Sequence, residues 1–491
     1  MIARSEETDM HRALPGASAL GRAGPALVPL AVTGVLYLAL LLAGDQLLND
    51  PDSYWHVVVG RWMVDHRAFP TADPFSFTFA GSPWIAKEWL SQILYAGAQA
   101  LAGWPGMVVL AAAAAALAFA LFTRALLTNL RPLYAVLFAA VAFLLAAPHI
   151  VARPHVLAFP VMVAWIAALV RAADEKRTPS LWLLPLMVLW ANLHGGFTFG
   201  IMMVGALSLD AIASAPRSER LATAARWVGF GLLALAAGCI TPYGWQSMLM
   251  TVRILGLGPA LSILGEWKPA DFSHLGGLEI VLLLGLGATL RRGVTLPPVR
   301  VVILLGLVHM ALSADRNAEM FGLVAPLVIA RPLAAQIAAI RGTPREAASP
   351  RLFAGVIAVL IAALLAASIA LAAAFHYTPN ARITPAAAVD ALKRANPGPV
   401  LNQYDFGGYL VYEGVPTFID GRTELYGGSF FDRYYKAVML ADLAGFDGLL
   451  DKYGIKATLL APDTPAVAYL DRQPGWHRLY ADDIAVVHVR D

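Results

Sequence analysis

The stretch RLFAGVIAVLIAALLAASIALAAAFH, from Arg351 to His376, decides the fold class of this chain, because no charged residue interrupts it between its ends. A helix rises about 1.5 Å per residue, so about 20 apolar residues cross the ~30 Å hydrocarbon layer of a membrane. Further apolar runs recur along the chain: Ala26–Leu47, Trp89–Thr123, Pro132–Ala147, Val156–Val170, Leu181–Leu193, Phe197–Leu209, Trp227–Ile240, Ile280–Leu290, Val301–Ala314 and Phe321–Ala330. This pattern predicts an α-helical polytopic membrane protein with about 11–13 spans.

The composition agrees with this class and excludes others. Hydrophobic residues make up 58% of the chain and charged residues 14%, whereas soluble proteins carry about 25% charged residues. The net charge of +3 does not suggest the concentrated basic face of a nucleic-acid-binding protein, so we expect no nucleic-acid partner. The lone cysteine, Cys239, excludes an internal disulfide bond and a cysteine metal site.

The N-terminal apolar run is long for a signal-peptide core and lacks an obvious cleavage site, so we expect a retained first span. The residues before it mix charges with glycine and proline. We therefore predict a disordered cytoplasmic tail over residues 1–25, a membrane domain over residues 26–375 and a separate domain over residues 376–491.

Loops rich in Lys and Arg mark the cytoplasmic side of a membrane protein. Four such loops are present: Arg171–Arg177, Arg217–Arg226, Arg291–Arg300 and Arg331–Arg351. Because Leu352–Phe375 follows the last of them, we expect everything after it to be extracytoplasmic. The same alternation places four other segments outside: Ala152–His155, Asn192–Gly196, Thr241–Ser273 and Asp315–Asn317. We expect the loop Asn49–Lys87 to be outside as well, because the N-terminus carries Arg4, Arg12 and Arg22.

One region leaves this count open. Trp89–Thr123 has no charge and is long enough for two short passes, with Trp104–Gly106 as their turn. Two passes would return the chain to the outer side, where Asn49–Lys87 is expected. The basic residues that follow would then lie outside, although Lys and Arg favour the cytoplasmic side. One segment between Trp89 and Val170 must therefore be re-entrant or split differently.

The region from Pro379 to Asp491 changes character. Short strand-like runs appear at Pro399–Asn402, Thr417–Asp420, Ala457–Ala461, Arg478–Tyr480 and Ile484–Val489. Helical stretches lie between them, notably Phe430–Lys452. Alternating strands and helices predict a small α/β domain.

The first outer loop predicts an interfacial helix over Ser53–His66. Trp55, Val58, Trp62 and neighbouring apolar residues recur at helical spacing, and tryptophan prefers the membrane–water boundary. Two interpretations of the acidic residues at the start of this helix stay open. They are either a helix cap and a solvated charge, or carboxylates that point into a pocket at the membrane surface.

Several stretches together resemble the GT-C class of membrane glycosyltransferases, which includes the dolichyl-phosphate-mannose protein mannosyltransferases and the bacterial aminoarabinose transferases. They are DPDSYWHVVVGRWMVDHRAFPTADPFSFTFAGSPWIAKEWL (Asp50–Leu90), ARPH (Ala152–His155), WANLHGGF (Trp190–Phe197), Arg316–Asn317 and YDFGGYLVYEGVPTFIDGRTELYG (Tyr404–Gly427). The resemblance is to a bacterial branch, so it implies an inner-membrane protein. It implies transfer of a sugar from a polyprenyl-phosphate donor in the membrane to a glycan, lipid or protein acceptor.

In this class an acidic residue of the first outer loop acts as catalytic base or positions the acceptor. By motif position this role falls on Asp52 or Asp50, with Asp52 favoured, although the sequence here is Asp-Pro-Asp rather than Asp-Glu. Cations are needed for the departing phosphate. The candidate substrate-binding residues are Trp55, His56, Asp73, Glu88, Arg153, His155, His194, Arg316, Asn317, Asp420, Arg422 and Tyr426. A divalent cation also accompanies some members, but no ligand set stands out.

Alternatives to these roles stay open. Arg153 could be an interfacial anchor rather than a phosphate ligand, and Arg316 could simply pair with Asp315. Asp420 and Arg422 lie in an Asp-Gly turn, or they belong to a lid that contacts the acceptor. A transporter or flippase of lipid-linked glycans and a polymerase or ligase of O-antigen type are the rival functions. The absence of an internal repeat disfavours the first, and the acidic early loop disfavours the second.

Overall fold

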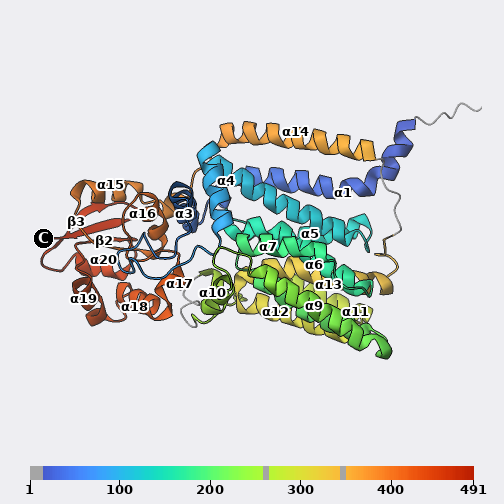
Figure 1. The fold of residues 1–491 in the computed structure, drawn as a ribbon. Helices are drawn as coiled ribbons and strands as arrows, with labels where there is room; N and C mark the ends of the chain where they lie inside the picture. Colours follow the sequence, from blue (N-terminus) through green and yellow to red (C-terminus); the bar gives the residue numbers. More distant parts are fainter. Residues whose placement is uncertain (1–14, 258–264, 343–349) are drawn as a thin grey trace, which may run out of the picture.

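The computed structural model describes residues 15–257, 265–342 and 350–491. Figure 1 shows a bundle of long helices with a smaller α/β domain at one end. The predicted N-terminal tail falls largely on residues 1–14, which lie outside the described ranges. Helix α1 (Pro15–Leu42) already begins inside the predicted tail.

The bundle is that of a multi-pass membrane protein. Within the described ranges, seven helices are long and apolar enough to cross a membrane. They contain α4 (Trp89–Leu126), α5 (Pro132–Ala146), α6 (Pro154–Asp174), α8 (Phe197–Ser214), α9 (Arg220–Gly238), α13 (Ala318–Gln336) and α14 (Pro350–Phe375), where α5, α9 and α13 each count together with an adjoining 3-10 helix. Three shorter apolar helices lie in α1, in α7 (Leu184–Leu193) and in α12 (Pro298–Ser313). Helix α11 (Gly277–Arg292) packs beside α5.

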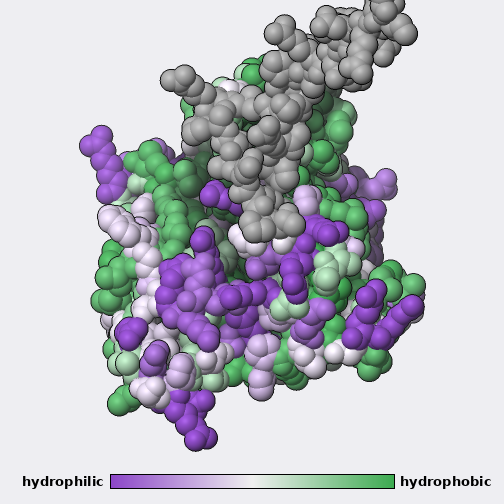
Figure 2. Space-filling model, turned by 90° about the vertical axis from the view of Figure 1, so that its right-hand side faces the viewer, coloured by the Kyte–Doolittle hydropathy of each residue, from purple (hydrophilic) through white to green (hydrophobic). Residues whose placement is uncertain are grey.

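The end of the bundle farthest from the α/β domain is polar. Figure 2 shows hydrophilic side chains gathered across this end, with hydrophobic ones around them. Arg171 in the last turn of α6 and Arg291 in the last turn of α11 belong to it. Just inside, buried Arg300 lies 2.5 Å from Asp174 and 2.9 Å from Asp210, and so ties α12 to α6 and α8.

Helix α4 is the region where the predicted number of spans stayed open. It is interrupted at Gly103, whose φ is +63°, and its two parts run in different directions (Figure 1). Trp89, at the start of the first part, donates a hydrogen bond to the end of α7, and Gln99 donates one to Tyr412 of the α/β domain. The first part therefore lies across the domain-facing end of the bundle. Of the alternatives left open for this region, the bend at Gly103 favours one crossing after the first part over two passes joined at Trp104–Gly106.

The α/β domain contains a four-stranded sheet in the order β1-β2-β4-β3. Its strands are β1 (Val400–Asn402), β2 (Ala457–Leu460), β3 (Trp476–Ala481) and β4 (Val486–Arg490). Strand β1 is parallel to β2, and the other pairs are antiparallel. Its helices are α15 (Ala386–Ala395), α16 (Gly407–Tyr412), α17 (Thr423–Tyr426), α18 (Gly428–Val438), α19 (Leu443–Lys452) and α20 (Pro465–Leu470).

Two predicted elements of this domain differ in the structure. Thr417–Asp420 is not a strand, because its backbone pairs with the Asn402 side chain and with the first outer loop instead of a sheet edge. Phe430–Lys452 is two helices, α18 and α19, because the chain turns at Leu440, whose φ is +54°.

The predicted interfacial helix is present as α3 (Asp52–His66). Its apolar face does not lie open to lipid, however. Trp55 and Met63 pack with Trp84 and Tyr243, so the rest of the outer loop and a later loop cover it.

The α/β domain sits directly on α3, and two glycines allow the close approach. A Cβ atom at Gly408 would lie 2.1 Å from the backbone oxygen of Pro51, and one at Gly421 would lie 1.8 Å from Asp52 Oδ1. Tyr54 of α3 adds edge-on aromatic contacts to Tyr409 of α16. The domain is thus seated on the helix that carries the acidic residues.

Candidate functional site

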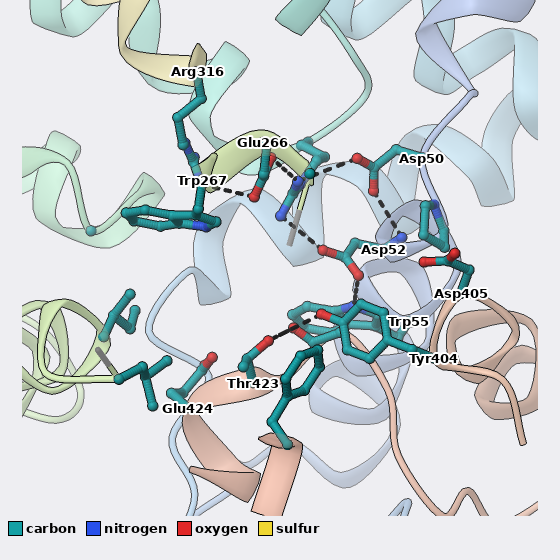
Figure 3. A pocket seen from close by; sticks show the side chains of 18 of the residues that line it. Asp50, Asp52, Trp55, Glu266, Trp267, Arg316, Tyr404, Asp405, Thr423 and Glu424 are labelled. Atoms are coloured by element: carbon teal, nitrogen blue, oxygen red, sulfur yellow. Dashed lines mark hydrogen bonds and ion pairs between the residues drawn. The ribbon is translucent and has the colours of Figure 1, made fainter. Parts of the chain in front are cut away.

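A cavity of about 570 Å³ lies where the bundle, the first outer loop and the α/β domain meet. Figure 3 shows it from close by. From the bundle side and its loops it is lined by Asp50, Asp52, Trp55, His56, Lys87, Glu88, Arg153, His194, Glu266, Trp267, Arg316 and Asn317, among others. From the α/β domain it is lined by Gln403, Tyr404, Asp405, Gly421, Thr423, Glu424, Phe431, Tyr434 and Tyr435, among others. Nine of the fourteen residues predicted from sequence therefore line one cavity.

Three carboxylates converge on Arg153 at one side of this cavity (Figure 3). Arg153 Nη2 lies 2.8 Å from Asp52 Oδ2, and its Nη1 lies 3.2 Å from Asp50 Oδ2 and 2.9 Å from Glu266 Oε2. The second oxygen of Asp52 accepts a hydrogen bond of 2.9 Å from Trp55 Nε1. The orientation of Asp52 is thus fixed from two sides.

The sequence places these groups at local turns. Asp50 precedes Pro51, the N-cap of α3, and accepts a hydrogen bond from the backbone N–H of Asp52. Arg153 is extended because Pro154 follows it and begins α6. Glu266 belongs to a short 3-10 helix, Gly265–Trp267.

Burial and charge shift the acidities of this cluster in different directions. Burial raises the pKa of Asp50 to about 7 against the opposing charge of Arg153. Burial also raises the pKa of Asp52, again opposed by Arg153. Burial would raise the pKa of Glu266, but the charges of Arg153 and Arg316 lower it to about 2. Glu266 therefore stays ionised, while the two aspartates are stronger bases than usual.

A second group of charges lines the opposite side. Lys87 Nζ lies 2.8 Å from Glu424 Oε1 of the α/β domain, and His194 Nε2 lies 3.4 Å from Glu88 Oε1. Burial lowers the pKa of His194 well below its usual range, so this ring is neutral.

Arg316 lies over the Trp267 ring at 4.8 Å, and its Nη1 donates to Glu266 at 2.9 Å. Among the described residues, its other guanidinium nitrogens have no hydrogen-bond partner. Arg316 therefore keeps donors for an anion in the cavity.

Five predicted site residues do not line the cavity, and four of them form one buried cluster. Arg422 donates to Asp73 Oδ1 at 2.5 Å and to Asp420 Oδ2 at 2.7 Å, and Tyr426 donates to Asp420 at 2.8 Å. The Arg422 side chain is fully buried, with its guanidinium 5.2 Å from the Phe75 ring and 4.8 Å from the Trp84 ring. We call Asp73, Asp420, Arg422 and Tyr426 the buried lock, because they join the first outer loop to the α/β domain. This placement argues against contact with an acceptor through these residues.

The remaining predicted residues have mixed positions. His56 lines the cavity and stacks on Trp55 at 3.8 Å. Asn317 also lines it, while its amide donates to the end of α12. His155 lies behind the cavity wall, where its Nε2 is 2.9 Å from the backbone oxygen of His149 and 3.9 Å from Glu319.

Several cavity residues were not predicted from sequence. Glu266 and Lys87 are charged residues at span ends, which usually serve as anchors. Gly421 carries a signal that could have found it, since it stands between the two charged residues of the Asp-Gly-Arg stretch. Tyr404 and Glu424 come from the same part of the chain and carry no signal of their own.

Comparisons with known proteins show the fold. No protein-family model matches this chain, and no curated protein matches it either. Among solved structures, the apo oligosaccharyltransferase of Archaeoglobus fulgidus is similar, with a TM-score of 0.52 and 13% identity over 89% of this chain and 69% of that one. The oligosaccharyltransferase AglB of the same organism, in complex with an inhibitory peptide and a dolichol-phosphate, gives a TM-score of 0.55 and 12% identity over 90% of this chain and 70% of that one. The resemblance to the GT-C class that the sequence motifs indicate is thus confirmed for the fold.

Proposed function

We propose that this protein is a membrane glycosyltransferase. It moves a sugar from a polyprenyl-phosphate donor to a hydroxyl group of a glycan, lipid or protein acceptor on the extracytoplasmic side. The observation that carries the proposal is the cavity at the junction of the bundle and the α/β domain. It is lined by two aspartates whose pKa values burial raises and by cationic side chains. The shared fold with archaeal oligosaccharyltransferases, one of them in complex with a dolichol-phosphate, supports it.

The reaction needs a proton acceptor and a stabilised leaving group. The acceptor hydroxyl attacks the anomeric carbon of the donor sugar, and the bond from that carbon to the phosphate oxygen breaks. Asp52 takes the hydroxyl proton. The departing polyprenyl phosphate keeps the electron pair of the broken bond, and Arg316 and Lys87 stabilise its negative charge. Both cations line the cavity.

The number of membrane crossings supports an extracytoplasmic position of the cavity. With α4 as a single crossing, eleven crossings by α1, α4–α9 and α11–α14 would place the arginine-rich loops on one side and the α/β domain on the other. The charged cavity residues lie at the domain-facing end of the bundle. A transporter would be expected to hold its polar site near the bilayer midplane.

The catalytic role of Asp52 is tested by transfer assays with purified protein and a panel of polyprenyl-phosphate sugars. Asp52→Asn keeps the shape of the side chain but cannot take a proton, so we expect a loss of about 10²–10⁴ in rate. Asp463→Asn, on the exposed surface of the α/β domain, is the matched control. If Asp52→Asn and Asp50→Asn both transfer at the wild-type rate, base catalysis at this position is refuted.

The sidedness is tested by cysteine labelling in a Cys239→Ala background. Cysteines placed at Ser82 in the outer loop and at Asp463 in the α/β domain should react with an impermeant reagent from outside the cell. One placed at exposed Lys176 should react after the membrane is opened. Labelling of Ser82 and Asp463 from opposite sides would contradict the proposal, since the two regions share the cavity.

A further inference from the structure

The arrangement of Asp50, Asp52 and Glu266 raises the question of a metal ion. Three carboxylates from two segments of the chain meet at one point of the cavity wall. Such convergence of oxygen ligands is typical of sites for Mg²⁺, Mn²⁺ or Ca²⁺. The resemblance to the GT-C class also allows a divalent cation.

The residues present do not fit such an ion, because a side chain already occupies the meeting point. The Arg153 guanidinium lies 2.8–3.2 Å from an oxygen of each carboxylate. A divalent ion binds oxygen at about 2.0–2.6 Å, so it would need the volume that the guanidinium fills. An arginine has no lone pair to offer a metal and stays protonated, so it would also repel the ion. Within the described ranges, no group of three or more His, Cys, Asp and Glu side chains is arranged to hold a metal ion.

Arg153 is held in this place by its backbone as well as by its side chain. Its N–H donates to the oxygen of Val151 at 2.7 Å, and its own backbone oxygen accepts from Tyr95 Oη at 3.0 Å. Pro154, the first residue of α6, restricts the backbone of Arg153 further. Removal of the guanidinium from the cluster would therefore leave three buried or half-buried carboxylates without their shared partner.

We propose that Arg153 is the resident cation of this site and stands where a divalent metal ion would otherwise be bound by Asp50, Asp52 and Glu266. The protein then performs transfer without an added metal. A guanidinium orients the carboxylates by directed hydrogen bonds and leaves further lone pairs of Asp52 free to accept a proton. This inference deepens the proposed function, and its activity test depends on that function.

The binding test compares Mn²⁺ affinity, read from the electron paramagnetic resonance signal of free Mn²⁺, in the full-length purified protein and its variants. Arg153→Ala frees the three carboxylates, so we expect it to gain one Mn²⁺ site at least tenfold tighter than any in the wild type. A second substitution, Glu266→Gln, should remove the gained site. Arg478→Ala is the matched control, because Arg478 is exposed and pairs with Asp471 alone at 2.6 Å.

Two results of this test would overturn the inference. One is a wild-type protein that binds a single Mn²⁺ ion and loses it on Asp52→Asn. The other is an Arg153→Ala variant that gains no site although its thermal unfolding remains cooperative. If Arg153→Ala does not fold, Arg153→Gln removes the charge at similar size and is read in the same way.

The activity test is chelation. Treatment of the wild type with EDTA should change the transfer rate by less than twofold. Loss of transfer that Mn²⁺ or Mg²⁺ restores would overturn the inference. If no donor supports transfer at all, the proposed function fails, whereas the Mn²⁺ comparison still decides the role of Arg153.

Discussion

The replacement of Gly421 by alanine should disable the site from the α/β domain. The added Cβ atom would lie 1.8 Å from Asp52 Oδ1, 2.7 Å from Asp52 Cγ and 2.9 Å from Trp55 Nε1. Non-bonded heavy atoms prefer separations of about 3.5–4.0 Å. One side of this contact must therefore move by well over 1 Å.

Neither side can yield easily. Asp52 is fixed by Arg153 at 2.8 Å and by Trp55 at 2.9 Å. Gly421 stands between Asp420 and Arg422 of the buried lock. We expect overpacking to cost about 1–3 kcal/mol of stability. A displacement of about 1 Å at a catalytic group can lower a rate about 10²-fold, and we expect a loss of that order.

The assay combines thermal unfolding with the transfer rate of purified protein. The matched control is Gly448→Ala on α19, where a Cβ atom would meet no other atom within 4 Å. This control should keep the wild-type rate and unfold at or above the wild-type temperature. A Gly421→Ala variant with wild-type rate and stability would refute the close seating of the domain on Asp52.

Three further predictions concern charge. The substitution Arg422→Met should lower the free energy of unfolding by about 3–5 kcal/mol, because it leaves Asp73 and Asp420 buried without a cation. Denaturant unfolding measures this free energy, and a loss under 1 kcal/mol would contradict the prediction. Since burial raises the pKa of Asp52, the proposed proton acceptor, the transfer rate should fall as the pH drops through that raised pKa and the carboxylate takes up a proton. Asp52→Asn should then show a low rate without this acidic limb, and an acidic limb that persists in the variant would assign it to another group. For Arg316, donor titration should give a several-fold weaker apparent affinity with Lys and a loss of roughly tenfold or more with Ala, whereas wild-type affinity in both would place the phosphate elsewhere.

The fold could be predicted from the sequence where a local pattern decides it. The length of the apolar runs identified the membrane helices, and short strand-like runs identified β1, β2 and β4. The path of α4 could not be read in this way, because a charge-free run has the same composition whether it lies across the bundle or along it. The bend depends on the backbone of Gly103 and on contacts of Trp89 and Gln99 with distant elements.

The candidate site was predictable to the extent that its residues cluster in unusual stretches. The first outer loop stood out by its acidic and aromatic residues, and Asp52 lies in the cavity. The cluster around Arg153 was not predictable, since Glu266 lies 113 residues away and carries no motif. The buried lock could not be predicted for a similar reason: Arg422 pairs with Asp73, 349 residues earlier, and sequence spacing gives no hint of that pairing.

The position of the α/β domain has a consequence for biogenesis. Gly421, Thr423 and Glu424 form part of the cavity wall, yet they are synthesised after the last apolar helix, α14. A nascent chain therefore inserts every bundle helix before its cavity has a complete wall. Asp52 of α3 meets Gly421 only after the α/β domain has been synthesised and has folded onto the bundle, so a partly synthesised chain has an open and incomplete cavity.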